Sequence, residues 1–235
     1  MDLPREFLNN RYQQLWDAAF EPVCQGDIII DPLLARREVD LRQCLTVLVR
    51  PSMAVQATVA AFLQELRVFE PGQYYYKAEE LHVTVLSLFT ATLEYEKKFR
   101  HYDRYLEAVN AALAVVPTFS LEFTGVTLTR EAVMIQGFFG DTILNDIREA
   151  LRKELRARDL TDGLDSRYVL QTAHMTAVRF RESLSGSHKF AQILEQFRQH
   201  NFGHTRVTEL QLVRNDWYMS TSSVEVLRRF STKGT

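Results

Sequence analysis

Two tripeptides of one form, His82-Val83-Thr84 and His174-Met175-Thr176, lie 174 − 82 = 92 positions apart in a chain of 235 residues. Each lies in a short apolar run, Leu81–Leu88 for the first and Ala173–Val178 for the second. Side chains on a strand alternate between two faces, so each histidine should share a face with its threonine. Two imidazoles and two hydroxyls that faced one cleft would supply a general acid, a general base and two neutral hydrogen-bond donors. The pattern therefore favours a fold that brings two distant strands together.

The bulk composition is that of an ordinary soluble globular protein, with 46% hydrophobic and 25% charged residues among 235. This length suits one large domain or two small lobes that share a core. The net charge of −2 gives no electrostatic case for a long nucleic-acid footprint, whereas a small nucleotide or the end of an RNA would fit better.

No apolar stretch approaches the ~20 residues of a membrane span, and the polar start of the chain lacks the apolar core of a signal peptide. We therefore expect a cytoplasmic protein with no membrane partner. The two cysteines, Cys24 and Cys44, form no CxxC or Cys/His cluster of the kind that binds zinc. No carboxylate stands at ligand spacing on either histidine strand. We expect two reduced thiols, no metal and no cofactor.

The order of predicted elements suggests a duplication. From Cys44 the pattern predicts strand, helix, histidine strand, helix and strand, and from Ala132 the same order recurs with one more strand at the end. The predicted segments are a helix over 4–20, a connection over 21–41, a strand over 44–49, a helix from Ser52 to about 70, a helix over about 97–115, a strand from Phe119, a strand over 132–138, a helix to about 155, a second histidine strand over about 168–180, a helix from Ser187, and strands over 207–213 and 224–230.

These elements predict an α+β, bilobal, duplicated fold. Two antiparallel sheets flanked by helices would enclose a central cleft that carries both His-x-Thr motifs. We expect an N-terminal helical extension over residues 1–41 and a two-lobed domain over 42–235, with pseudo-repeats of about 43–128 and 131–231.

The two motifs resemble the signature of the two-histidine (2H) phosphoesterase superfamily. That signature is a pair of His-x-Thr/Ser motifs about half a chain apart, each preceded by an apolar residue on a strand, as in Leu81-His82-Val83-Thr84-Val85 and Ala173-His174-Met175-Thr176-Ala177. Arg179 and Phe180 also resemble the Arg-aromatic pair common after the second motif. The similarity extends to the bacterial RNA 2′,3′-cyclic phosphodiesterases, also called 2′-5′ RNA ligases. The sequence Leu86-Ser87-Leu88-Phe89 and the N-terminal extension depart from that branch.

The resemblance implies metal-independent hydrolysis of a 2′,3′-cyclic phosphate or a related phosphodiester. One of His82 and His174 would deprotonate the attacking water, and the other would protonate the leaving ribose oxygen, with the roles open. Histidine suits both tasks because its ordinary pKa of ~6.5 lies near working pH. Thr84 and Thr176 would donate hydrogen bonds to the non-bridging oxygens of the phosphate.

Three further residues are candidates for substrate binding. Tyr75 and Trp217 sit in polar surroundings near strand ends and could stack on a base. Arg179 could meet a phosphate, although strand alternation places it opposite His174 unless a bulge intervenes. We expect a monomer whose partner is a nucleotide or the end of an RNA.

Two other functions are compatible with the same residues. One is a phosphodiesterase of 2′-5′-linked or cyclic signalling oligonucleotides. The other is a nucleotide-binding module that has kept the cleft and lost turnover, which the presence of both histidines and both threonines disfavours.

Overall fold

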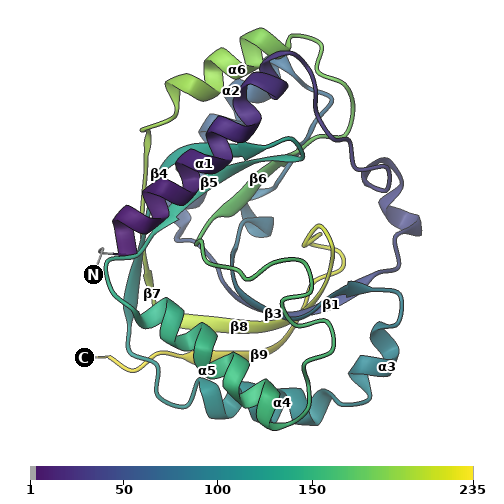
Figure 1. The fold of residues 1–235 in the computed structure, drawn as a ribbon, viewed down its shortest axis with the longest axis vertical. Coiled ribbons are helices and arrows are strands. Elements are labelled where there is room, and N and C mark those ends of the chain that lie inside the picture. The colour runs from purple at the N-terminus through teal and green to yellow at the C-terminus, as the bar shows by residue number, and fades with distance from the viewer. Residues whose placement is uncertain (1–3, 235) are drawn as a thin grey trace.

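The computed structural model describes residues 4–234, apart from the side chains of Pro4 and Glu38, and has the predicted α+β fold, in which two antiparallel sheets are flanked by helices (Figure 1). The three residues before Pro4, part of the predicted N-terminal extension, lie outside the described range. Figure 1 shows the two sheets as separate layers, with most of the helices on their outer sides.

The four-stranded sheet has the strand order β3-β1-β8-β9, and all its pairs are antiparallel. The first motif enters this sheet at its edge strand, β3, and helix α5 packs against that strand. The strand bounds are β1 (Gln43–Val49), β3 (Val83–Thr92), β8 (Glu209–Asp216) and β9 (Glu225–Ser231).

The five-stranded sheet has the order β2-β6-β5-β4-β7, and the second motif leads into β6. Helices α1, α2 and α6 cover this sheet, as the upper half of Figure 1 shows. The strand bounds are β2 (Tyr74–Tyr75), β4 (Phe119–Thr129), β5 (Ala132–Phe138), β6 (Met175–Arg179) and β7 (Asn201–Val207).

The helices follow the predicted positions with one exception. Their bounds are α1 (Pro4–Cys24), α2 (Met53–Phe69), α3 (Tyr95–Phe99), α4 (Tyr102–Ala112), α5 (Ile143–Ala157) and α6 (Ser187–Gln196). Ser52 caps α2, since its hydroxyl accepts a hydrogen bond from the backbone N–H of Val55. The single helix predicted over about 97–115 is wrong, because the backbone of His101 (φ −102°, ψ 18°) leaves helical geometry and separates α3 from α4.

Helix α1 is an integral part of the core. Its inner face buries Leu8, Tyr12, Trp16, Ala19 and Val23, which recur every three or four residues, against β4, β5 and α6. Full burial of each large apolar side chain contributes roughly 1.5–3 kcal/mol to folding. The helix therefore stabilises the sheet that carries the second motif.

Each motif strand has a bulge directly after its threonine. On β3, Thr84 pairs with Leu48 and Leu86 pairs with Val47, so Val85 is the extra residue. On β6, Thr176 pairs with Met134 and Val178 with Val133, so Ala177 is extra. A bulge shifts the alternation of side chains by one residue.

Both motif strands begin just after the histidine, and β6 is shorter than predicted. Strand β6 starts at Met175, so the predicted strand over about 168–180 is wrong for residues 168–174. Side chains supply backbone hydrogen bonds there. The N–H of Ala173 donates to the hydroxyl of Tyr12, and the carbonyl of Thr172 accepts from Arg148.

Candidate active site

His82, Thr84, His174 and Thr176 all line one cavity of about 170 Å³ between the two sheets. The structure thus brings together two motifs that lie 174 − 82 = 92 positions apart in the sequence. The wall also contains side chains of β1 and β8 and the segment 165–170. The cavity is the place where the two motif strands face each other.

The Nδ1 atom of His82 lies 2.8 Å from the carbonyl oxygen of Glu80. A carbonyl can only accept, so Nδ1 carries the proton and, in the neutral ring, Nε2 has a free lone pair. Glu80 is itself held in place, because its carboxylate accepts hydrogen bonds from the Tyr74 hydroxyl (2.8 Å) and from the backbone N–H of Lys77 (3.0 Å) and Thr221 (3.3 Å). The residue two positions before His82 therefore fixes the tautomer of its ring.

His174 has a different partner at the equivalent position. Its Nδ1 lies 2.7 Å from the hydroxyl of Thr172, which can donate or accept. In each motif the partner comes from the residue two positions before the histidine. The hydroxyl can pair with either neutral tautomer of His174 and with its protonated ring, whereas the carbonyl ties the neutral ring of His82 to one tautomer.

Both histidines are held neutral. Burial lowers the pKa of His82 to about 3, with the positive charge of Arg50 as a further cause. Burial lowers the pKa of His174 to about 4, with the charge of Arg148 as the next cause and that of Arg179 after it. A bound anion would counter these shifts, because negative charge favours the protonated ring.

The bulges decide which side chains accompany the motifs. Arg179 lines the cavity, although strict alternation along β6 predicts the opposite face. The extra residue Ala177 reverses the alternation and turns Arg179 inward. Ser87, five residues after its own histidine as Arg179 is after His174, also lines the cavity. The structure gives the hydroxyls of Thr84 and Thr176 no partner within residues 4–234, so both can bind a ligand.

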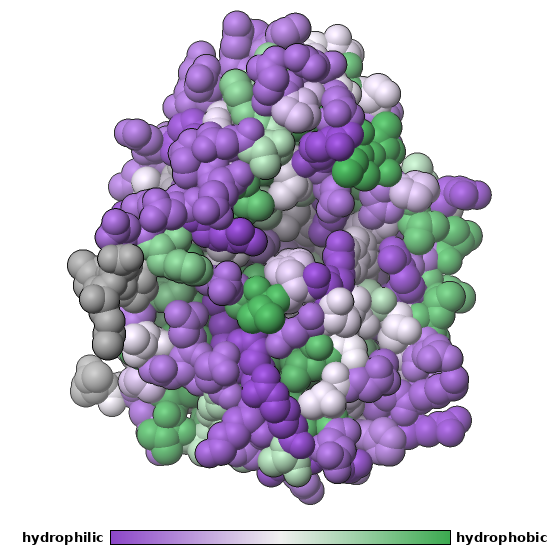
Figure 2. Space-filling model, viewed as in Figure 1, coloured by the Kyte–Doolittle hydropathy of each residue, from purple (hydrophilic) through white to green (hydrophobic). Residues whose placement is uncertain are grey.

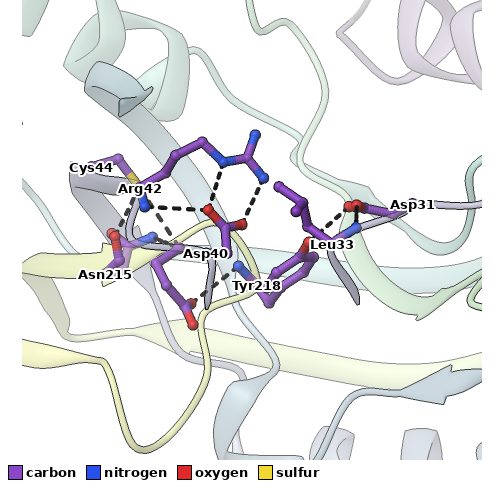
Figure 3. A network of polar contacts seen from close by, with 8 residues as sticks. Asp31, Leu33, Asp40, Arg42, Cys44, Asn215 and Tyr218 are labelled. Atoms are coloured by element: carbon purple, nitrogen blue, oxygen red, sulfur yellow. Dashed lines mark hydrogen bonds and ion pairs between the residues drawn. The ribbon is translucent and has the colours of Figure 1, made fainter. Parts of the chain in front are cut away.

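Trp217 lines the cavity and is surrounded by guanidinium groups. The central guanidinium carbon of Arg167 lies 4.5 Å from the ring centroid, that of Arg179 lies 5.3 Å away and that of Arg42 lies 5.6 Å away. Figure 3 shows the polar network of Arg42, whose guanidinium donates two hydrogen bonds to Asp40 at 2.8 and 2.6 Å. Within the described part of the chain, Arg167 and Arg179 have no carboxylate partner, so both remain available to an anion.

Tyr75, the third candidate for substrate binding, is not among the cavity-lining side chains. It is buried elsewhere, and its hydroxyl donates to the carbonyl of Glu70 at 2.8 Å. The next residue, Tyr76, lines the cavity instead, and Arg179 donates to its hydroxyl at 3.1 Å. The sequence could not decide between Tyr75 and Tyr76, because β2 is only two residues long and gives no alternation pattern.

Sequence reasoning missed Cys44, Thr46, Asn215 and Arg167 on the cavity wall. Burial raises the pKa of the Cys44 thiol to about 12, so it stays protonated and is a poor nucleophile. Asn215 donates from Nδ2 to the carbonyl of Asp216, while its Oδ1 has no partner among residues 4–234. Cys44, Thr46 and Asn215 come from β1 and β8, whose place beside the motifs depends on sheet order.

Residues 4–234 contain neither a cluster of metal ligands nor a membrane-spanning helix. No group of three or more His, Cys, Asp or Glu side chains in this range is placed to hold a metal ion. No helix in the same range has the length and apolarity needed to cross a membrane. On the face shown in Figure 2, hydrophilic residues predominate and the hydrophobic patches are small and separate.

The chain thus belongs to a class of α+β proteins in which two His-x-Thr motifs from different sheets line one cavity. Solved structures with a similar fold support this description. TT0787 of Thermus thermophilus aligns with a TM-score of 0.61 at 18% identity, over 83% of this chain and 99% of that one. E. coli LigT complexed with 3′-AMP aligns with a TM-score of 0.55 at 15% identity, over 82% and 99%. ATU0111 from Agrobacterium tumefaciens aligns with a TM-score of 0.52 at 13% identity, over 81% and 86%. No curated protein sequence matches the chain.

The model of the 2′-5′ RNA ligase superfamily matches residues 55–217, which is more than half of the chain. The protein therefore belongs to the 2′-5′ RNA ligase superfamily. The expected resemblance to the two-histidine phosphoesterases is confirmed, and the protein is of the phosphoesterase kind.

Proposed function

We propose that the protein is a metal-independent phosphodiesterase that hydrolyses 2′,3′-cyclic phosphates of RNA ends or small nucleotides. The observation that carries the proposal is the convergence of both histidines and both threonines of the motifs on one cavity. Two groups able to transfer protons and two neutral donors suffice for in-line displacement at a phosphodiester.

The hydrogen bonds of the two rings favour one assignment of roles. His82 is the general base, because its Nδ1 proton is committed to the Glu80 carbonyl and its Nε2 lone pair is free to take a proton from water. His174 is the general acid, because its Thr172 partner can accept a hydrogen bond from Nδ1 when the ring is protonated. In this scheme the oxygen of water attacks phosphorus, the bond from phosphorus to one ribose oxygen breaks, and His174 protonates that oxygen.

The charge on the cavity wall favours an anionic substrate. Arg167 and Arg179 lack carboxylate partners among the described side chains, and Asp165, the one acidic residue among those recorded on the cavity wall, is paired with Arg152 at 2.7 Å. A phosphodiester would receive hydrogen bonds from the two motif threonines and positive charge from Arg179.

Trp217 supports the same kind of substrate in two ways. Its cation–π contacts with Arg167 and Arg179 hold both guanidinium groups near the cavity. Its ring also lines the cavity, where it would stack on the base of a nucleotide.

The test is a set of hydrolysis assays with EDTA present. The substrates are 2′,3′-cyclic AMP, an RNA oligonucleotide ending in a 2′,3′-cyclic phosphate, a 2′-5′-linked dinucleotide and 3′,5′-cyclic AMP. We expect turnover of the first two at full rate in EDTA. Faster cleavage of the 2′-5′ dinucleotide would favour the signalling-oligonucleotide alternative, and saturable binding without product would favour a binding module.

A crystal soak gives an independent check of the same proposal. E. coli LigT has been crystallised with 3′-AMP, which makes a nucleoside monophosphate a sensible first ligand for this chain. We expect its phosphate between the two motif threonines. A phosphate bound outside the cavity would contradict the proposed site.

A further inference from the structure

Arg148 is a buried cation that the proposed reaction does not use. It lies on α5, is 1% exposed and does not line the cavity. A buried charge is costly unless it is paired or fully hydrogen-bonded. Among the side chains that the structure describes, no carboxylate forms an ion pair with it, and burial lowers its pKa to about 10. A buried charge of this kind indicates a specific role for Arg148.

The guanidinium of Arg148 bonds to the backbone of both motif segments. Its Nε donates to the carbonyl of Val85 at 2.9 Å, and its Nη2 donates to the carbonyls of Thr84 at 3.2 Å and Thr172 at 2.6 Å. The first two carbonyls belong to β3 and the third to the segment that leads into β6. These strands lie in different sheets, so no strand ladder joins them.

The planar guanidinium of arginine is better suited than the flexible amine of lysine to hold the two motif segments together. The planar guanidinium offers five N–H donors in fixed directions, and three acceptors around one such group fix their mutual spacing. In-line catalysis is sensitive to the distance between Thr84 and the His174 segment. Arg148 also places a positive charge behind His174.

We propose that Arg148 is a positioning residue, which fixes the two motif strands relative to each other and supplies a buried positive charge behind the anion-binding cavity. This inference rests on the proposed function, because it assumes that the motifs act on one phosphodiester. Arg148 acts through the strands and through His174, without touching substrate.

Several titratable and charged groups surround the ring of His174. His174 faces Arg148 from α5, Arg179 from its own strand and His82 from the opposite motif, with Tyr12 of α1 behind the backbone of Ala173. The segment that lines the cavity adds Asp165 and Arg167. Of these cations, Arg148 is the one outside the cavity, so it can be replaced without removing a substrate contact.

The experiment compares Arg148→Met and Arg148→Lys with Arg198→Met as a matched control. Arg198 is a partly buried arginine that also donates to a backbone carbonyl, that of Val126 at 2.7 Å, but it lies outside the cavity. For each protein, NMR titration of His174 is measured without ligand, and kcat and KM are measured for a 2′,3′-cyclic nucleotide. Thermal unfolding is recorded for every variant.

We expect Arg148→Met to raise the titration midpoint of His174 by about 1 pH unit, because a nearby like charge is removed. Arg148→Lys keeps the positive charge, so the titration midpoint of His174 should stay near that of the wild type. It loses the planar guanidinium, so kcat should fall on the order of 10²-fold. Arg198→Met should change neither the titration midpoint of His174 nor kcat. An unchanged midpoint in Arg148→Met overturns the electrostatic part, and wild-type kcat in Arg148→Lys overturns the positioning part.

The experiment still decides the proposal if a variant does not fold or if the wild type is inactive. If Arg148→Met does not fold, Arg148→Gln takes its place in the titration, and Arg148→Lys still decides the positioning part. If the wild type hydrolyses no cyclic phosphate, the proposed function has failed, whereas the ligand-free titration of His174 still tests whether Arg148 controls that ring.

Discussion

The Nδ1 atom of His82 and the carbonyl oxygen of Glu80 lie 2.8 Å apart, so the ring donates a hydrogen bond to the backbone two residues earlier in the chain. This bond leaves Nε2 of the neutral ring as the atom able to accept a proton. We therefore expect a two-bond ¹H–¹⁵N correlation spectrum of the ligand-free protein at pH 7 to show His82 with its proton on Nδ1. A ring with its proton on Nε2 would contradict the assignment of His82 as base.

Replacement of either histidine should abolish most activity. Each proton transfer by a positioned side chain contributes about 10²–10⁴-fold to the rate, so His82→Gln and His174→Gln should each lower kcat by at least ~10²-fold. His204→Gln is the control, because this histidine does not line the cavity. Steady-state hydrolysis of a 2′,3′-cyclic nucleotide measures the effect, and a His82 variant as fast as the wild type would refute the proposed mechanism.

Removal of a motif hydroxyl should reduce turnover more than binding. Thr84→Val and Thr176→Val keep the side-chain shape and lose a donor to the phosphate oxygens, whose charge grows in the transition state. A donor of this kind contributes about 2.7–4 kcal/mol, or ~10²–10³-fold in kcat. Thr58→Val, on α2 and outside the cavity wall, provides the control. A rise in KM with unchanged kcat would indicate ordinary ground-state binding instead.

The pH optimum of kcat/KM should lie on the acid side of the ordinary histidine pKa. Burial lowers the pKa of His82 to about 3 and that of His174 to about 4, and the proposed reaction needs the first neutral and the second protonated. Because kcat/KM reports the free enzyme, it should fall as pH rises above the His174 pKa and peak below the ordinary histidine pKa of ~6.5. A profile measured from about pH 4 to 9 tests this, and a peak above about pH 7 would contradict it.

Tyr12 should contribute measurably to stability. Its buried hydroxyl donates to the carbonyl of Gly137 at 2.9 Å and accepts from the N–H groups of Gly137 (3.1 Å) and Ala173 (3.3 Å). Tyr12→Phe leaves these backbone groups without a partner, which costs about 1–3 kcal/mol in the free energy of unfolding. Urea unfolding measures it, with Tyr95→Phe as control. Equal stability of the two variants would contradict the role of Tyr12.

The fold class and the four motif residues could be predicted because they depend on short-range patterns. Alternating apolar residues mark the strands, and the same three-residue signature occurs twice. The order of strands within each sheet was not predictable, since it depends on pairings between distant segments. This explains why Asn215 and Cys44, brought beside the motifs by β1 and β8, were missed.

Arg179 and Arg148 show two other limits of sequence reasoning. The orientation of Arg179 follows from one extra residue, Ala177, and no pattern in the sequence marks a bulge there. Arg148 stands at the spacing of the apolar stripe of α5, between Ile147 and Leu151, where an arginine is normally taken for a solvent-facing residue. Its three carbonyl acceptors become visible only in the folded chain.

Strand β1 lies between β3 and β8 in the four-stranded sheet, yet it precedes residue 55, where the family similarity begins. A recombinant fragment trimmed to residues 55–217 would leave two unsatisfied backbone edges where β1 belongs. Bare edges of this kind template intermolecular pairing. Such a fragment would also lack helix α1 and strand β9. Insoluble material from it would reflect these missing parts of both sheets, and cloning boundaries for relatives of this chain should be chosen from sheet order.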